Sequence, residues 1–306
     1  KNPIAEGNFQ WIFARNCEGT EQLRILLKRR GNRRMLNILY EDETVLVVWK
    51  PVGMESQSGH GFDADMVSEI RRYLSTGKPV DNHKLSTKSV EPYVGVIHRL
   101  DKPVSGVMVY AKTKRAAAAL SEQVQSHKMK KIYTAVVHGR PVNMVDNYVD
   151  YMVKTPDGNY SQVVDKGITG AKKAELSYEV LKTIDGEAAG MPGKELSLVR
   201  VALKTGRHHQ IRVQMAHHGT PLYGDMRYGV PVGTAKLDKK ENADQGTMKA
   251  AGNRNMPGIR TAGNMGSGRE SIALCASSLN FFHPVTKKEM TFEIEPVGGA
   301  FQLFQV

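Results

Sequence analysis

Apolar residues along this chain fall into short runs separated by polar turns, and their spacing predicts the secondary structure. Apolar runs, typical of buried strands, occupy residues 45–49 and 106–111. The sequence also predicts strands over 132–137, 174–181 and 196–203, and final strands at Phe281 and 290–294. Apolar positions three or four residues apart predict helices instead, over 21–30, 63–74, 115–126 and 208–218. Many strands interrupted by a few helices indicate the α+β fold class.

Two stretches follow neither pattern. Residues 75–91 are polar and basic, which is typical of a loop. Residues 231–269 are rich in Gly, Lys, Asn, Ala and Met and contain no apolar period. They hold too little apolar surface to offset the entropy lost on ordering, so we predict a mobile insertion there.

The charge of the chain indicates its class of partner. A net charge of +12 and an isoelectric point near 9.5 favour a polyanion, either nucleic acid or an anionic membrane surface. No apolar run approaches the roughly 18 residues that span a bilayer, and the first residues do not resemble a secretion signal. We therefore expect a nucleic-acid partner and no membrane association.

Cysteine usage bears on the cellular compartment. The 306 residues include two cysteines, Cys17 and Cys275, whose spacing fits neither a disulfide framework nor a zinc site. Ordinary thiols are typical of a reducing compartment, so we expect the cytoplasm. The chain begins with Lys1 rather than Met, which leaves open the removal of a leader.

The candidate for chemistry is Asp101, a carboxylate in a turn between two strand-like segments. Arg99 and Lys102 flank it, and nearby cations favour the ionised form of a carboxyl group. An ionised carboxylate serves as a nucleophile or a base. Aspartate is also common in turns for purely structural reasons, and the turn alone does not decide between the two interpretations.

Further motifs support the catalytic interpretation. Residues 98–106 (HRLDKPVSG) resemble the HRLDxxTSG motif of the RluA-type RNA pseudouridine synthase family. Other segments are similar to this family's motifs in the same order: 38–42, 50–53, 131–137 (KIYTAVV), 205–213 (TGRHHQIRV), 222–229 (LYGDMRYG) and 282–284. The resemblance covers roughly residues 36–229 and 271–296. Val104 stands where the family often has Thr, which removes a hydroxyl from the turn.

The resemblance implies the fold, the domains and the reaction. It implies a mixed, mainly antiparallel sheet with flanking helices and an RNA-binding cleft. Residues 36–306 would form the catalytic domain, with the insertion at 231–269. Residues 1–35 would be a basic N-terminal extension without an S4 module; their basic cluster is either a phosphate-binding arm or a solvated helix end. The reaction would convert uridine to pseudouridine in tRNA or rRNA.

The resemblance also implies the site residues. Asp101 would be the catalytic carboxylate, Arg212 its ion-pair partner, and Tyr133 the aromatic residue against the target base. Asp101 would attack C1′ of the ribose, attack C6 of the uracil, or remove the C2′ proton, and the sequence leaves these routes open. Candidate RNA-binding residues lie beside the catalytic turn and at the start of the predicted helix: Arg99, Lys102, Lys204, Arg207 and His208.

Isomerisation is neutral in redox terms, so we expect no cofactor and no metal. The pairs His208-His209 and His217-His218 do not give the spacing of metal ligands on one helix face.

We expect a monomer. The competing class is a non-catalytic RNA-binding protein or RNA chaperone on the same scaffold, which would have no need of Asp101, Tyr133 and Arg212 together. A glycosidase would need a second acid, and Asp225 resembles a turn residue.

Overall fold

The computed structural model describes residues 36–58, 65–76, 91–229 and 271–304, together with two strands nearer the N-terminus. The predicted insertion at 231–269, the basic cluster at 28–34 and most of the predicted loop at 75–91 lie outside the described residues.

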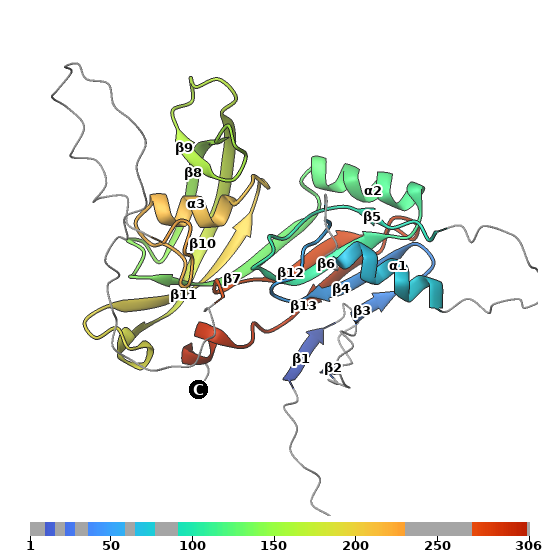
Figure 1. The fold of residues 1–306 in the computed structure, drawn as a ribbon, viewed down its shortest axis with the longest axis horizontal. Coiled ribbons are helices and arrows are strands. Elements are labelled where there is room, and N and C mark those ends of the chain that lie inside the picture. Colours follow the sequence, from blue (N-terminus) through green and yellow to red (C-terminus); the bar gives the residue numbers. More distant parts are fainter. Residues whose placement is uncertain are drawn as a thin grey trace, which may run out of the picture.

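The described strands join into a single sheet (Figure 1). In chain order they are β1 (Gln10–Arg15), β2 (Gln22–Leu27), β3 (Asn37–Glu41), β4 (Val45–Lys50), β5 (Gly95–Val96), β6 (Ser105–Ala111), β7 (Lys130–His138), β8 (Val145–Lys154), β9 (Ser161–Val164), β10 (Lys172–Asp185), β11 (Glu195–Leu203), β12 (Leu274–Phe282) and β13 (Glu289–Glu293). The helices are α1 (Met66–Thr76), α2 (Lys114–Gln125) and α3 (Gln210–His217), with 3₁₀ turns η1 (Gly186–Ala189) and η2 (Gly299–Phe304).

The sheet runs in the order β2-β1-β13-β12-β7-β11-β10-β8-β9, and β6 joins it beside β12 while carrying β4, β3 and β5. Among the described strands, the β6–β12 pair is parallel and the other pairs are antiparallel. The predicted α+β class and the mixed, mainly antiparallel sheet are therefore confirmed. In Figure 1, β8 to β11 and α3 lie on one side of β7, and β3 to β6, α1 and α2 lie on the other.

Alternation along the strands divides the core between the two faces of the sheet. Leu46, Val48, Met108 and Tyr110 on one face pack against α1 through residues such as Met66. Their neighbours on the same strands, among them Val45, Val47, Val107 and Val109, face the other way and pack with Ala116 and Leu120 of α2. The two helices therefore cover opposite faces of β4 and β6.

The structure contradicts one predicted helix. Residues 21–30 contain strand β2, which pairs antiparallel with β1 through registers such as Trp11↔Leu26. In the sequence Gln22 and Arg24 alternate with Leu23 and Ile25, and this period of two was outweighed by the overlapping helical spacing. The predicted helix that ends in the basic cluster is accordingly wrong over Gln22–Leu27.

The sequence analysis also missed β8 and β9. Along β8 the exposed residues Val145 and Val149 alternate with the buried residues Tyr148 and Met152, so both faces carry apolar side chains. The alternation of polar and apolar residues that signals a strand is therefore absent. The helix predicted for 208–218 begins only at Gln210, because His209 adopts a left-handed conformation with φ of 55°.

No helix within residues 36–58, 65–76, 91–229 and 271–304 is long and apolar enough to cross a membrane.

Candidate active site

Asp101 lies in the turn between β5 and β6, and both of its neighbours in the chain are anchored. Ser56 Oγ donates to the carbonyl oxygen of Leu100 at 2.7 Å and accepts the Leu100 N–H at 2.9 Å. The Lys102 carbonyl accepts the Gly53 N–H at 2.8 Å. The turn that presents Asp101 is therefore tied on both sides to the loop after β4.

A buried lysine, Lys50, also joins the loop after β4 to the Asp101 turn. Its side chain is fully buried, and Nζ donates to the carbonyl oxygens of Met54 at 2.6 Å, Pro51 at 3.0 Å and Lys102 at 3.4 Å. Burial lowers the pKa of Lys50 to about 8, against the opposing effect of Asp101. Since its hydrogen bonds reach the loop after β4 and the Lys102 carbonyl, Lys50 is a structural anchor of the turn that presents Asp101.

Gly106, directly after the turn, fixes the parallel pairing of β6 with β12. A Cβ atom at Gly106 would lie 2.5 Å from the backbone nitrogen of Ala276, and the residue adopts φ of 138°. Only glycine accommodates both requirements. The Ser105-Gly106 pair of the motif therefore positions the β6 strand that follows Asp101.

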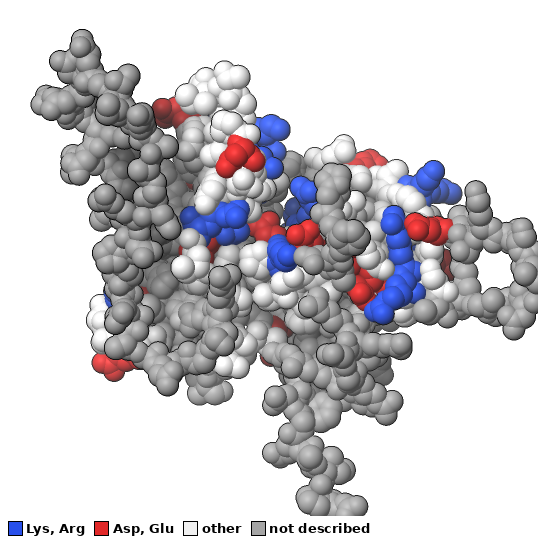
Figure 2. Space-filling view, viewed as in Figure 1, with Lys and Arg blue, Asp and Glu red and all other residues white. Residues whose placement is uncertain are grey.

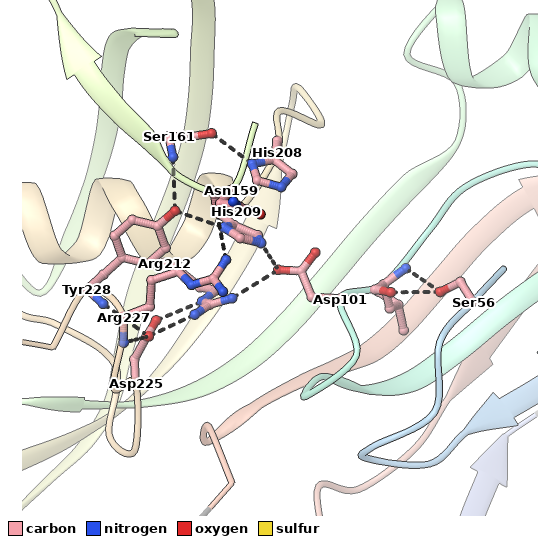
Figure 3. A network of polar contacts seen from close by, with 11 residues as sticks. Ser56, Asp101, Asn159, Ser161, His208, His209, Arg212, Asp225, Arg227 and Tyr228 are labelled. Atoms are coloured by element: carbon pink, nitrogen blue, oxygen red, sulfur yellow. Dashed lines mark hydrogen bonds and ion pairs between the residues drawn. The ribbon is translucent and has the colours of Figure 1, made fainter. Parts of the chain in front are cut away.

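Arg212 on α3 faces Asp101 from the other half of the sheet (Figure 3). Its Nη1 lies 3.4 Å from Oδ2 of Asp101. The Arg212 side chain is 6% exposed, whereas that of Asp101 is 30% exposed and open to the cleft. The predicted pairing of these two residues, 111 positions apart in sequence, is present in the structure.

The stronger partner of Arg212 is Asp225, which the sequence analysis interpreted as a turn residue. Nε and Nη2 of Arg212 donate to the two carboxylate oxygens of Asp225 at 2.7 Å and 2.8 Å, a bidentate pair. Burial raises the pKa of Asp225, but the hydrogen bonds and charge of Arg212 outweigh burial and lower it. Asp225 also accepts the N–H groups of Arg227 and Tyr228. It therefore aims Arg212, and the similarity of residues 222–229 to a family motif was the signal for it.

Tyr133 lies on β7 in the same cleft and is 6% exposed. Burial raises the pKa of Tyr133, and the negative charge of Asp101 raises it further. The phenol consequently stays protonated near neutral pH and is available as a hydrogen-bond donor. The structure thus brings the three predicted catalytic residues to one cleft.

His209 is a second contact of Asp101 that the sequence analysis did not select. Its Nε2 lies 3.5 Å from Oδ2 of Asp101, and its Nδ1 lies 2.8 Å from the hydroxyl of Tyr228. That hydroxyl accepts the N–H of Ser161 at 3.0 Å, so its own proton is free to point at Nδ1. The remaining proton of a neutral His209 ring is then on Nε2, facing the carboxylate of Asp101 (Figure 3).

A pH-dependent stability follows from the His209 environment. Burial lowers the pKa of His209 to about 4, against the opposing charge of Asp101. In the unfolded chain a histidine binds its proton near pH 6.5. Between these values the unfolded state binds more protons, so His209 makes folding less favourable as the pH falls.

The test compares the wild type with His209→Gln, which has no proton to bind in this range. Urea unfolding should show that the wild type loses stability relative to the variant as the pH falls from about 6.5 to about 4. A stability difference that stays constant over this range would contradict a buried, neutral His209.

A cleft of about 1140 Å³ surrounds these residues, between the β5–β6 turn and the start of α3. Strands β7, β10 and β11 contribute lining residues, and so does the loop 204–207. Figure 2 shows basic and acidic side chains interleaved in the middle of the drawn face. The cleft is lined by Lys and Arg residues together with the carboxylates of Asp101 and Glu175.

The predicted RNA-binding residues differ in their positions. Arg99, Lys204, Arg207 and His208 line the cleft, whereas Lys102 is absent from its described lining. Lys204 donates to Glu175 at 2.8 Å, and His208 Nδ1 lies 2.9 Å from the Ser161 hydroxyl. Arg207 donates from Nε to the Lys173 carbonyl. Lys102 lies 3.8 Å from Glu55.

One group of described residues is compact enough to hold a metal ion. Atoms of Asp150, His217 and His218 that can ligate a metal all lie within 4.8 Å of one another. The His218 Nε2 lies 3.1 Å from Asp150, and its ring stacks on Tyr148. None of the three appears among the residues described as lining the cleft. The sequence analysis considered the two histidines without Asp150, which comes from β8.

The fold matches solved structures. A human protein described as RNA pseudouridylate synthase domain containing 4 is similar at a TM-score of 0.56 and 20% identity, covering 87% of this chain and 90% of that one. Human RNA pseudouridylate synthase domain containing 1 is similar at a TM-score of 0.55 and 17% identity, covering 88% and 93%. At this identity the likeness concerns the fold. The fold therefore defines the class of architecture to which the protein belongs, that of the pseudouridine synthases.

Sequence similarity specifies the family. The chain belongs to the RNA pseudouridylate synthase family, which matches residues 44–217. It is 30% identical to ribosomal large subunit pseudouridine synthase D of Zymomonas mobilis over 261 residues, covering 85% of this chain and 69% of that protein. It is 33% identical to the D enzyme of Xylella fastidiosa over 251 residues, covering 82% and 62%. The protein is therefore an isomerase that converts uridine to pseudouridine in RNA.

Proposed function

We propose that Asp101 carries out the isomerisation, with Arg212 and Tyr133 as its partners. The observation that supports this proposal is the contact of Arg212 with Asp101 at 3.4 Å in a cleft that is open on the Asp101 side. A guanidinium at this distance stabilises the carboxylate anion. Attack at C1′, attack at C6 and removal of the C2′ proton all begin with that anion.

In this proposal Tyr133 holds the target uracil. Its ring is suited to stack on an extruded base, because bases and aromatic rings stack without regard to sequence. A uridine inside an RNA helix is out of reach of Asp101, so it must be flipped into the cleft at a cost of a few kcal/mol. Arg99, Lys204, Arg207 and His208 are placed to hold the RNA backbone around it, and Lys102 would act from outside the cleft. Phosphate contacts of this kind position the RNA.

The substrate we propose is ribosomal RNA of the large subunit. Relatives of this chain that cover most of it are described as ribosomal large subunit pseudouridine synthases. Because every residue of the site comes from one chain, we further propose that the enzyme acts as a monomer. The cytoplasm, where ribosomes are assembled, is the proposed location.

The proposed substrate is tested by mapping pseudouridines with carbodiimide sequencing in cells with and without this protein. We expect at least one stop in large-subunit RNA to disappear when the protein is removed and to return when the wild-type gene is restored. A gene carrying Asp101→Asn should fail to restore it. A stop that disappears from tRNA, with no change in ribosomal RNA, would contradict the proposed substrate.

A further inference from the structure

Lys131 lies two residues before Tyr133 on β7. Since side chains alternate along a strand, the two residues project from the same face of the sheet, and both line the cleft. Lys131 pairs with Leu203 of β11, directly before the loop 204–207. The ammonium group therefore lies between Tyr133 and the loop that precedes α3.

The ammonium of Lys131 has no partner among the residues that the structure describes. Among residues 36–58, 65–76, 91–229 and 271–304, no carboxylate and no hydrogen-bond acceptor lies within bonding distance of its Nζ. Burial lowers the pKa of this side chain. Other lysines of the site differ: Lys50 donates to three carbonyl oxygens, and Lys173 and Lys204 pair with Glu175. Lys131 is thus a partly buried cation that the described part of the chain leaves uncompensated.

Two groups near Lys131, His98 and Gly206, offer its ammonium no acceptor. The His98 ring accepts the N–H of Val109 on Nε2 at 3.2 Å, so its proton is on Nδ1, which is buried and has no acceptor in the described residues. Burial lowers the pKa of His98 to about 3, so the ring stays neutral. A Cβ atom at Gly206 would lie 3.5 Å from Lys131 Nζ, and a longer side chain there would cover the ammonium. Two neighbouring donors therefore lack acceptors on one wall of the cleft.

We propose that Lys131 binds a backbone phosphate of the RNA, next to the flipped uridine. An uncompensated buried ammonium is neutralised by an anion, whereas a neutral uracil carbonyl leaves its charge in place. The phosphates on either side of a flipped uridine enter the cleft with it, and lysine binds phosphate as a point charge. The proposal requires RNA as the substrate and is independent of which RNA it is.

The probe for this site is a labelled twelve-residue oligouridine, whose binding is followed by fluorescence anisotropy at several salt concentrations. Replacing Lys131 by Met keeps the length of the side chain and removes the charge. We expect affinity to fall about tenfold at low salt, and the slope of log K against log salt to flatten by roughly 0.7, the value for one phosphate contact on a single strand. Lys128→Met, an exposed neighbour outside the described cleft lining, is the matched control and should leave both unchanged.

Two further measurements separate this role from other roles of Lys131. The melting temperature of Lys131→Met without RNA should rise, because an uncompensated charge has been removed. Uridine 3′,5′-bisphosphate should bind the variant more weakly than the wild type, while uridine itself should bind both equally. Lys131→Arg, which retains the charge, should keep the salt slope. An unchanged slope in Lys131→Met, a lower melting temperature, or an equal loss of uridine binding would each overturn the proposal.

Discussion

Replacing Asp101 by Asn should reduce isomerisation by about 10³-fold or more while RNA affinity stays within about twofold of the wild type. The amide keeps the shape of the side chain, but it provides neither the nucleophile nor the base that the reaction needs. Tritium release from RNA labelled at uridine C5 measures the reaction, because C5 loses its hydrogen when the new C5–C1′ bond has formed. Affinity is measured on the same RNA by filter binding.

The matched control for this prediction is Asp165→Asn, at an exposed position in the turn after β9. It makes the same chemical change outside the described cleft lining and should leave tritium release unchanged. Tritium release by Asp101→Asn at a rate close to that of the wild type would remove Asp101 from the mechanism. The enzyme would then have to use a different carboxylate.

Replacing Asp225 by Asn should give the second large effect, on both stability and activity. The variant leaves the Arg212 guanidinium, 6% exposed, without its bidentate partner. Breaking a buried ion pair from one side costs about 3–5 kcal/mol of unfolding free energy. Arg212 is also released from the orientation in which it faces Asp101, so tritium release should fall even at temperatures where the variant is folded.

A double variant separates these two effects of Asp225. Adding Arg212→Met to Asp225→Asn removes the uncompensated charge, so unfolding in urea should show part of the lost stability regained. Activity should stay low, because the guanidinium that faces Asp101 is now absent. If Asp225→Asn alone were as stable and as active as the wild type, Asp225 would have no role in positioning Arg212.

The fold was predictable where the apolar residues followed a single pattern, either that of a strand or that of a helix. The continuous apolar runs of β4 and β6 identify strands that are buried on both faces, and the helix α2 follows from its alanine-rich spacing with Leu120 inward. Strand β8 carries apolar residues on its exposed face, and β2 contains overlapping periods, so local patterns did not identify them. These segments become strands because β8 pairs with β10 and β2 pairs with β1, and such pairing depends on the tertiary structure rather than on the local sequence.

The site was predictable only as far as its motifs reach. Asp101, Tyr133 and Arg212 each stand in a motif, so the resemblance could assign them before their distances were known. The contacts of Asp225 and His209 depend on how the turn after α3 folds back onto the helix, which no spacing within one segment reports. Lys131 shares a motif with Tyr133, but its lack of a partner among the described residues becomes visible only with its neighbours in place.

The most direct measurement adds the purified protein to an unmodified transcript of large-subunit ribosomal RNA and analyses the digested nucleosides by chromatography and mass spectrometry. The account predicts a new nucleoside with the mass of uridine and the retention time of pseudouridine, formed by the wild type and absent with Asp101→Asn. Its formation by both proteins would contradict the role of Asp101, and its absence with both would contradict the proposed substrate.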